Sequence, residues 1–339
     1  MTTPASLATP PTKHADLVVD GLQVYYDTPE GVVKAVDGVT FTLKQGERLA
    51  LVGESGSGKS TLAMALMRLT KPPGRISGGH VHLGGRDLVG LTDSEMRLVR
   101  LKEIALVPQG AMNSLNPVMR VQDQIMDGIV DHVPHGSPKP QYAELRERVQ
   151  GLLARVGLAP GVARLFPHEL SGGMKQRVAM AISISLSPKV IVADEPTSAL
   201  DVVVQRQVMQ TLGRLQVGLD ASVILIGHDM GLIAQFADRV GVMYAGKLVE
   251  IGPVQQIFED PLHPYTRLLI ESLPSLEVKK SFAGIPGLPP PLLHLPPGCV
   301  FHPRCPKFIK GRCESVEPAF LESRKERFVS CHLYPEAVK

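Results

Sequence analysis

The chain has 339 residues, 44% of them hydrophobic, which is enough for one large core and a smaller appended unit. The formal net charge is only +3 and the basic residues are scattered, so nothing in the composition demands a nucleic-acid partner. No apolar run reaches the roughly 18 residues that a membrane-spanning helix needs. The Thr- and Pro-rich start, residues 1–16, lacks the apolar core of a secretory signal. We therefore expect a cytosolic chain with reduced thiols.

In chain order, the first predicted elements are strands. Residues 17–26 and 41–44 are rich in Val, Tyr and Thr and predict the start of an antiparallel sheet. Residues 48–53 predict a short buried strand. The following segment, 59–69, predicts a helix because its apolar residues recur at helical spacing.

The middle of the chain predicts alternating helices and buried strands. Such an alternation makes an α/β core with a parallel sheet. A Pro- and Gly-rich loop at 133–140 separates the predicted helices 121–131 and 142–156. The predicted helices are 121–131, 142–156, 172–186 and 202–219, and the predicted strands are 104–108, 190–193 and 223–226.

Residues 53–61 read Gly-Glu-Ser-Gly-Ser-Gly-Lys-Ser-Thr and fit the phosphate-loop pattern G-x-x-x-x-G-K-[ST]. Glycines let the backbone N–H groups approach phosphate oxygens, and the helix N-terminus that follows attracts anions. Lys59 is expected to reach the β- and γ-phosphates, and Ser60 to ligate Mg²⁺. The alternative is a glycine-rich turn without a ligand, which the strand before it and the helix after it disfavour. The candidate loop residues are Gly53, Ser55, Gly56, Ser57, Gly58, Lys59, Ser60 and Thr61.

Two acids, Asp194 and Glu195, directly follow the apolar strand 190–193. A strand end of this kind lies at the edge of the sheet beside the phosphate loop. Asp194 is predicted to hold Mg²⁺, directly or through water, and Glu195 to polarise the attacking water. Taken alone, the two acids fit a solvated strand end equally well.

Residues 170–177 read Leu-Ser-Gly-Gly-Met-Lys-Gln-Arg and begin a predicted helix 18 residues before the acidic strand. Together with the phosphate loop and the two acids, this string resembles the signature motif of the ATP-binding cassette (ABC) family. The resemblance implies an α/β fold: a RecA-like core with an antiparallel β subdomain and a helical subdomain, closing as a dimer around two ATP molecules. In it, Ser171, Gly172 and Gly173 would cap the γ-phosphate of the partner's ATP. The alternative is an ordinary helix that Ser171 caps.

The same resemblance assigns further residues. Gln109 matches the glutamine that senses Mg²⁺ and the lytic water, and His228 matches the histidine that hydrogen-bonds the γ-phosphate. A lone histidine at a strand end is more often structural. Asp201 matches a loop that crosses the dimer interface. Tyr26 matches the aromatic residue that stacks on adenine, and its neighbour Tyr25 stays open as the competitor.

The end of the chain differs in composition. Residues 285–297 hold six prolines and predict a stiff linker into a small tail that carries every cysteine. No C-x-x-C pair is present, so an ordinary zinc site fits poorly. The string 299–306 resembles the C-terminal extension of dipeptide and oligopeptide importer ATPases, where such cysteines carry a [4Fe–4S] cluster. Cluster, zinc and free thiols stay open for Cys299, Cys305, Cys313 and Cys331.

We therefore expect an ABC ATPase domain at 16–258, with a helical subdomain at about 110–186, and a cysteine-bearing extension at 259–339. Met174 in the signature and the His-Pro-Tyr-Thr segment at 263–266, opening a helix to 273, resemble the D-type ATPase of these importers. One departure from the family lies around Gln109. Residues 107–110 read Val-Pro-Gln-Gly, where the family more often has Phe-Gln-Asp-Pro.

The resemblance implies ATP and Mg²⁺ as ligands, and uptake of dipeptides or oligopeptides as the function. The implied partners are an F-type ATPase as heterodimer, two transmembrane permease subunits, which residues 110–120 would face, and an extracytoplasmic solute-binding protein, with no nucleic acid. The subunit would lie peripherally on the cytoplasmic face of the inner membrane. Alternative cargoes are an oligosaccharide or a nickel chelate. A soluble ABC ATPase without transport and an exporter ATPase are less favoured.

Overall fold

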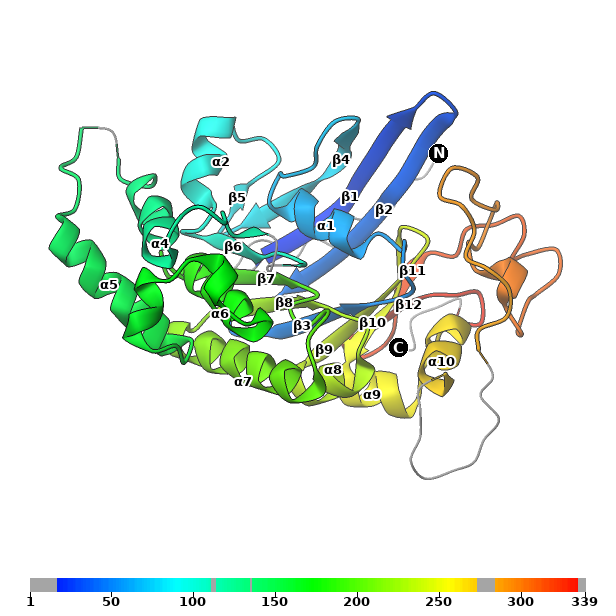
Figure 1. Ribbon diagram of the computed structural model, residues 1–339. Coiled ribbons are helices and arrows are strands. Elements are labelled where there is room, and N and C mark those ends of the chain that lie inside the picture. Colours follow the sequence, from blue (N-terminus) through cyan, green and yellow to red (C-terminus); the bar gives the residue numbers. More distant parts are fainter. Residues whose placement is uncertain (1–16, 111–113, 135, 273–283, 335–339) are drawn as a thin grey trace.

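The computed structural model describes residues 17–110, 114–134, 136–272 and 284–334 (Figure 1). The predicted start of the cassette at residue 16, part of the predicted membrane-facing stretch 110–120 and the end of the predicted helix at 273 lie outside these ranges.

A four-stranded antiparallel sheet in the order β2-β1-β4-β5 forms one layer. The predictions of strands at 17–26 and 41–44 are confirmed, but the second strand is three times longer than predicted. Bulges interrupt its pairing with β1 and break the apolar alternation, which hides its first half in the sequence. The strands are β1 (Leu17–Thr28), β2 (Gly31–Leu43), β4 (Gly74–Leu83) and β5 (Arg86–Asp87).

The second sheet has eight strands in the order β11-β12-β10-β9-β3-β8-β7-β6. The five strands from β9 to β6 run parallel, which confirms the predicted α/β core. The other three are antiparallel to their neighbours. These three strands and β9 were not predicted. The strands are β3 (Arg48–Val52), β6 (Ile104–Val107), β7 (Val190–Asp194), β8 (Ser222–Ile226), β9 (Arg239–Tyr244), β10 (Lys247–Pro253), β11 (Phe320–Arg324) and β12 (Arg327–Ser330).

The helices agree closely with the sequence prediction where apolar periodicity is strong. The helix at 202–219 is found with the predicted bounds, whereas the first helix ends at Leu66 because Arg68 takes a left-handed conformation, with φ 48°. No helix in the described ranges is long and apolar enough to cross a membrane. The helices are α1 (Lys59–Leu66), α2 (Asp93–Val99), α4 (Val121–Val130), α5 (Tyr142–Arg155), α6 (Gly172–Ser183), α7 (Val202–Leu219), α8 (Met230–Phe236), α9 (Val254–Glu259) and α10 (Pro264–Glu271), with 3₁₀ turns at Pro160–Arg164, Pro167–Glu169 and His302–Arg304.

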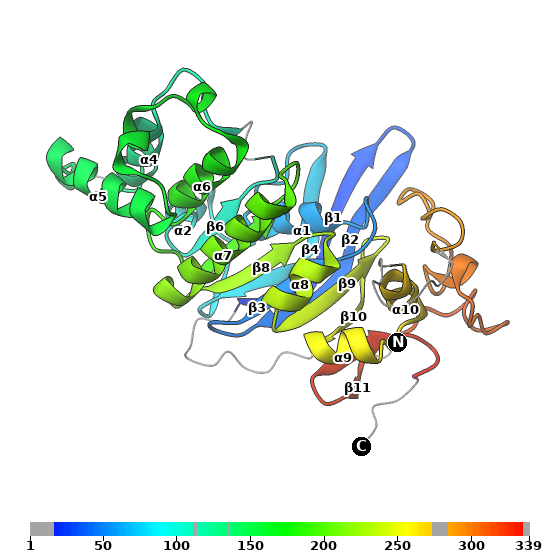
Figure 2. The same cartoon turned by 60° about the horizontal axis from the view of Figure 1, so that its bottom comes forward.

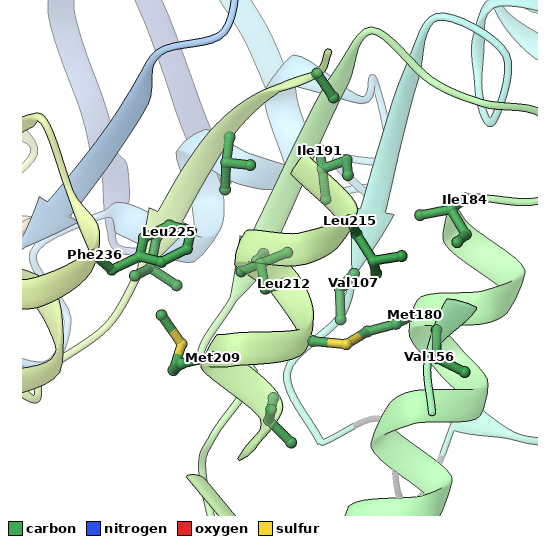
Figure 3. Packing of buried hydrophobic residues seen from close by; sticks show 14 of the residues in the cluster. Val107, Val156, Met180, Ile184, Ile191, Met209, Leu212, Leu215, Leu225 and Phe236 are labelled. Atoms are coloured by element: carbon green, nitrogen blue, oxygen red, sulfur yellow. The ribbon is translucent and has the colours of Figure 1, made fainter. Parts of the chain in front are cut away.

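Both faces of the eight-stranded sheet are covered. Along β3, Ala50 and Val52 belong to the core under α4 to α8, whereas Leu49 and Leu51 belong to the core shared with α1 and the four-stranded sheet. Figure 2 shows α7 and α8 lying across one face of the sheet. In Figure 3, Leu212 and Leu215 of α7 lie among apolar side chains of the sheet. A strand buried on both faces reads as a continuous apolar run, which is why β3, β7 and β8 were predicted.

The C-terminal segment is built into this sheet. Strand β12 pairs with β10 at Glu250–Val329 and Ile251–Phe328. Beneath the pairing, Arg327 donates to Glu250 Oε1 at 2.8 Å, and both side chains are fully buried. Figure 1 shows the tail in orange and red at one end of the molecule, beside β10 and α10. The extension is therefore joined to the cassette by backbone pairing and a buried ion pair.

Candidate active site

The phosphate loop connects the end of β3 to the start of α1. Gly53 and Gly58 have φ values of 145° and 100°. A Cβ on Gly53 would lie 2.1 Å from the carbonyl oxygen of Met243, and one on Gly58 would lie 2.1 Å from that of Ala35. These two positions therefore require glycine for both conformation and space. The loop fits tightly between β9 and β2.

Lys59 lies at the centre of this loop with only 7% of its surface exposed. Its ammonium group donates to the carbonyl oxygens of Gly53 at 2.8 Å and Glu54 at 2.9 Å, and to Ser57 Oγ at 3.1 Å. Burial lowers the pKa of Lys59, while the nearby Glu195, Asp194 and Glu54 counteract this shift. The cation is thus positioned where the loop's N–H groups would receive an anion.

Asp194 ends β7 directly beside α1. Ser60 Oγ donates to Asp194 Oδ1 at 3.1 Å, and the aspartate is 1% exposed. Burial raises the pKa of Asp194, and Glu195 raises it further. A buried carboxylate next to a hydroxyl is the oxygen donor set that suits Mg²⁺, which is usually held by one or two carboxylates together with substrate phosphates. These two residues therefore fit the predicted ion.

Glu195 is the first residue after β7 and takes a left-handed conformation, with φ 43°. Gln109 Nε2 donates to Glu195 Oε2 at 2.8 Å, and His228 Nδ1 lies 3.9 Å from Oε1. The strand ends of β6, β7 and β8 thus bring together the three residues predicted to act in catalysis. One pocket is lined jointly by loop residues, Gln109 and Glu195; its loop members are Ser55, Gly56, Gly58, Lys59, Ser60 and Thr61.

The signature residues do not line that pocket. Ser171 caps α6 by accepting from Met174 N at 3.3 Å, and Asp201 caps α7 by accepting from Val204 N at 3.0 Å. A Cβ on Gly173 would lie 2.5 Å from Val204 Cγ1, so the two helix starts pack together. The signature and the predicted interface loop therefore form one surface outside the chain's own phosphate pocket.

The two tyrosines have different surroundings. Tyr25 donates its hydroxyl to Asp37 Oδ1 at 2.6 Å, and burial together with Asp37 raises its pKa. Tyr26 packs against the core of the four-stranded sheet, with its ring beside Gly74. Neither ring lines the phosphate pocket, where Ala35 and Leu292 lie instead. The stacking role of Tyr26 stays a prediction.

The four cysteines lie near one another in the tail. Burial raises the pKa of Cys299 to about 11 and that of Cys331 to about 12, and the thiols of Cys305 and Cys313 contribute to both shifts. The Cys299 N–H donates to the carbonyl oxygen of Cys313 at 2.8 Å. Within the described ranges, however, no group of three or more Cys, His, Asp or Glu side chains is arranged to hold a metal ion. The arrangement therefore gives no support to the predicted [4Fe–4S] cluster.

Two family profiles match this chain. Residues 36–198 match the ABC transporter family, and residues 249–313 match the C-terminal region of oligopeptide/dipeptide transporters. The dipeptide transport ATP-binding protein DppD of Caldanaerobacter subterraneus is 43% identical over 320 residues, which cover 94% of this chain and 97% of that protein. The chain belongs to the ABC transporter family. The resemblance of the phosphate loop, the signature and the acidic strand end to the ABC family is confirmed, and the chain is an ATPase subunit.

Other relatives agree with this assignment. The oligopeptide transport ATP-binding protein OppD of Salmonella typhimurium is 43% identical over 303 residues, with 89% of each chain covered. Among solved structures, the dimeric ATP-binding cassette MJ0796 bound to ADP and Pi superposes with a TM-score of 0.63 at 27% identity. That match covers 70% of this chain and 98% of the solved one, so the ABC cassette is present in full and the remainder is additional.

Proposed function

We propose that this subunit hydrolyses ATP to power the uptake of dipeptides or oligopeptides across the cytoplasmic membrane. The observation that carries the ATPase part is the single pocket shared by Lys59, Ser60, Gln109 and Glu195. Peptide cargo is supported by the match of residues 249–313 to oligopeptide/dipeptide transporters and by the relatives named for peptide transport.

Binding of the triphosphate follows from the loop. Its backbone N–H groups and the start of α1 receive the phosphate oxygens, and Lys59 neutralises the β- and γ-phosphates. Ser60 and Asp194 would hold Mg²⁺, with Gln109 as a further ligand. When bound, the ion neutralises charge on the phosphates during transfer.

Hydrolysis needs an oriented water. Glu195 lies at the edge of the pocket, 2.8 Å from the Gln109 amide, and accepts a proton from the attacking water. Gln109 holds the carboxylate on one side. His228 approaches it from the other side and reaches the γ-phosphate in the closed assembly. All three residues follow parallel strands, so the sheet edge sets their spacing.

The surface made by Ser171, Gly172, Gly173 and Asp201 caps the ATP of a second ATPase subunit of the F type. Its position outside the chain's own pocket supports this role, because helix starts bind anions wherever one is supplied. Binding of two ATP molecules then closes the pair, and hydrolysis reopens it. Two permease subunits and an external solute-binding protein complete the importer. The ATPase pair sits on the cytoplasmic face of the membrane.

Transport by the membrane assembly tests this function. The complex would be purified through a tag on this chain, its subunits identified, and the complex placed in vesicles with labelled dipeptides, oligopeptides, oligosaccharides or nickel chelates. We expect permease subunits to co-purify and ATP-dependent uptake of peptides only. Uptake of a sugar or a nickel chelate in place of peptides would show that this other solute is the cargo. A complex without permease subunits would contradict the transport function.

For the tail we propose a domain boundary near residue 258 and a metal centre, a [4Fe–4S] cluster, held by Cys299, Cys305, Cys313 and Cys331. The resemblance of residues 299–306 to the importer extension and the four cysteines of the tail support it. Iron and sulfide analysis after anaerobic purification tests the cluster. A colourless, iron-free and folded protein would overturn it.

A further inference from the structure

An ion pair joins the phosphate loop to the C-terminal extension. Glu54 is the second residue of the loop, and Arg304 follows it by 250 residues. Arg304 Nη1 donates to Glu54 Oε2 at 2.7 Å, and Nη2 donates to Oε1 at 3.0 Å. The arginine side chain is 5% exposed and the glutamate side chain 25%. This bidentate geometry is the strongest form of carboxylate recognition by arginine.

The guanidinium group makes further contacts that fix it in place. It donates to Tyr244 Oη at 3.2 Å and to the carbonyl oxygen of Pro286 at 2.7 Å, and Gly287 accepts at 3.3 Å. It also lies over the ring of Tyr244, 5.7 Å from the centroid. One side chain therefore connects the phosphate loop, strand β9 and the proline-rich segment.

The backbone of Glu54 is held as well. Its N–H donates to Tyr265 Oη at 2.8 Å, and Tyr265 belongs to α10 in the extension. Tyr265 packs against Tyr244 and against Phe301 of the tail, with ring centroids 4.6 and 5.3 Å apart. The carbonyl oxygen of Glu54 accepts from Lys59, so a displacement of this residue would reach the phosphate-binding ammonium directly.

The segment anchored by Arg304 also reaches the nucleotide pocket. Leu292 lines the pocket that contains Lys59 and Glu195. Its carbonyl oxygen accepts from the N–H of Lys34 in β2 at 3.3 Å. An adjoining hollow is lined by Pro289, Pro290 and Pro291 on one side and by Ser55 and Gly56 on the other. The linker thus forms one wall of the site rather than a spacer beside it.

We propose that the C-terminal extension is part of the nucleotide site, with Arg304 as a positioning residue. Through Glu54 it holds the phosphate loop, and through the carbonyl groups of 286–287 it places Leu292 at the pocket wall. This inference rests on the proposed ATP-binding function and adds a tail residue to it.

The test is titration of the full-length chain with a fluorescent ATP analogue in the presence of Mg²⁺. R304M and E54Q are each expected to raise the Kd about tenfold or more, because each removes a charged hydrogen-bonded pair. The double variant R304M/E54Q should be no worse than the worse single variant, since both act through one contact. R304K should lie between wild type and R304M, because an ammonium group cannot form the paired bonds.

Arg324 provides the matched control. It is also a tail arginine in an ion pair, donating to Asp260 Oδ2 at 2.6 Å on the exposed surface, away from the loop. R324A should keep the wild-type Kd. The melting temperature of each variant reports whether it folds. If R304M fails to fold, the Kd of E54Q tests the proposal, because E54Q removes the same ion pair. Wild-type affinity in folded R304M or folded E54Q would overturn the proposal. If wild type itself bound no nucleotide, the ATPase function would fail instead.

Discussion

Single residues of the phosphate loop are constrained by space as much as by chemistry. Gly53 has no room for a Cβ, because the carbonyl oxygen of Met243 would lie 2.1 Å away, whereas a Cβ on Gly56 would meet nothing within 4 Å. Gly53 therefore serves the packing of β3 against β9. The open surface at Gly56 faces the pocket, where a ligand would approach the backbone.

G53A is expected to lower the free energy of unfolding by at least about 2 kcal/mol, since it adds left-handed strain and a backbone clash. Chemical denaturation of the full chain measures the change. The matched control is G151A on the exposed side of α5, where a Cβ meets nothing and alanine should stabilise the helix by up to about 1 kcal/mol. Equal stability of G53A and wild type would contradict the packing argument.

Most of the chemical residues are readable from the sequence because they stand in local strings. Lys59, Ser60, Asp194 and Glu195 need only a few neighbours to be recognised, and the structure brings them together at one sheet edge. Leu292 could not be predicted in this way. Its place in the pocket wall depends on a contact with β2 that lies more than 250 residues away along the chain.

At the scale of elements, the first residues of a helix can cap it and can also bind an anion. Thr92 caps α2 through a capping box, in which its Oγ1 accepts from Glu95 N at 3.3 Å. Ser171 caps α6 in the same way through Met174 N. The proposed function gives Ser171 a second role at the ATP of the partner subunit, which Thr92 lacks.

S171A and T92A should therefore each cost about 1 kcal/mol of stability, the usual loss for a cap. Only S171A should also lower ATP turnover of the assembled complex, by about tenfold or more. Denaturation and phosphate-release assays on both variants separate the two effects. If S171A kept the turnover of T92A, Ser171 would be a cap and nothing else.

Helix α10 begins with a buried histidine whose neutral form is required. His263 Nδ1 accepts from Tyr265 N at 3.1 Å, and burial lowers the pKa of His263 from about 6.5 to about 3. The unfolded chain thus binds a proton between these values that the folded chain does not. Stability from this residue is complete above pH 6.5 and is lost as the pH falls.

Between pH 6.5 and pH 5 we expect the free energy of unfolding to fall by up to about 1.4 kcal/mol per pH unit from this residue. H263N, which keeps an acceptor at the cap, should show a slope smaller by that amount, even if its stability is lower throughout. Denaturant titrations at several pH values give the slopes. Identical slopes for the two proteins would contradict the assignment.

The elements predicted from the sequence have a strong helical period or a continuous apolar run, whereas short strands of mixed burial were missed. The helix α7 was found with its predicted bounds because its apolar face repeats over 18 residues. Strands β11 and β12 are short, and their burial patterns are mixed. Their pairing is fixed by β10 and by the buried Arg327–Glu250 pair, which join residues 77 positions apart. No local window contains that information.

The whole molecule is a cassette with a tail that contacts it at several places. Strand β12 extends the large sheet at its edge, and Arg304 reaches the phosphate loop from the same extension. Figure 1 shows the tail at the end of the molecule where α10 and the tips of β1 and β2 lie. The contact between the tail and the phosphate loop therefore does not involve α4, α5 or α6.

The most direct test of the ATPase account is phosphate release by the complex purified through this chain, compared between wild type and E195Q. We predict ATP-dependent turnover in wild type and a rate at least ~10²-fold lower in E195Q, the scale expected when a general base is lost. E195Q should bind ATP with unchanged affinity, because Glu195 acts on the water. Turnover of E195Q at the wild-type rate, or a wild-type complex that releases no phosphate, would contradict the account.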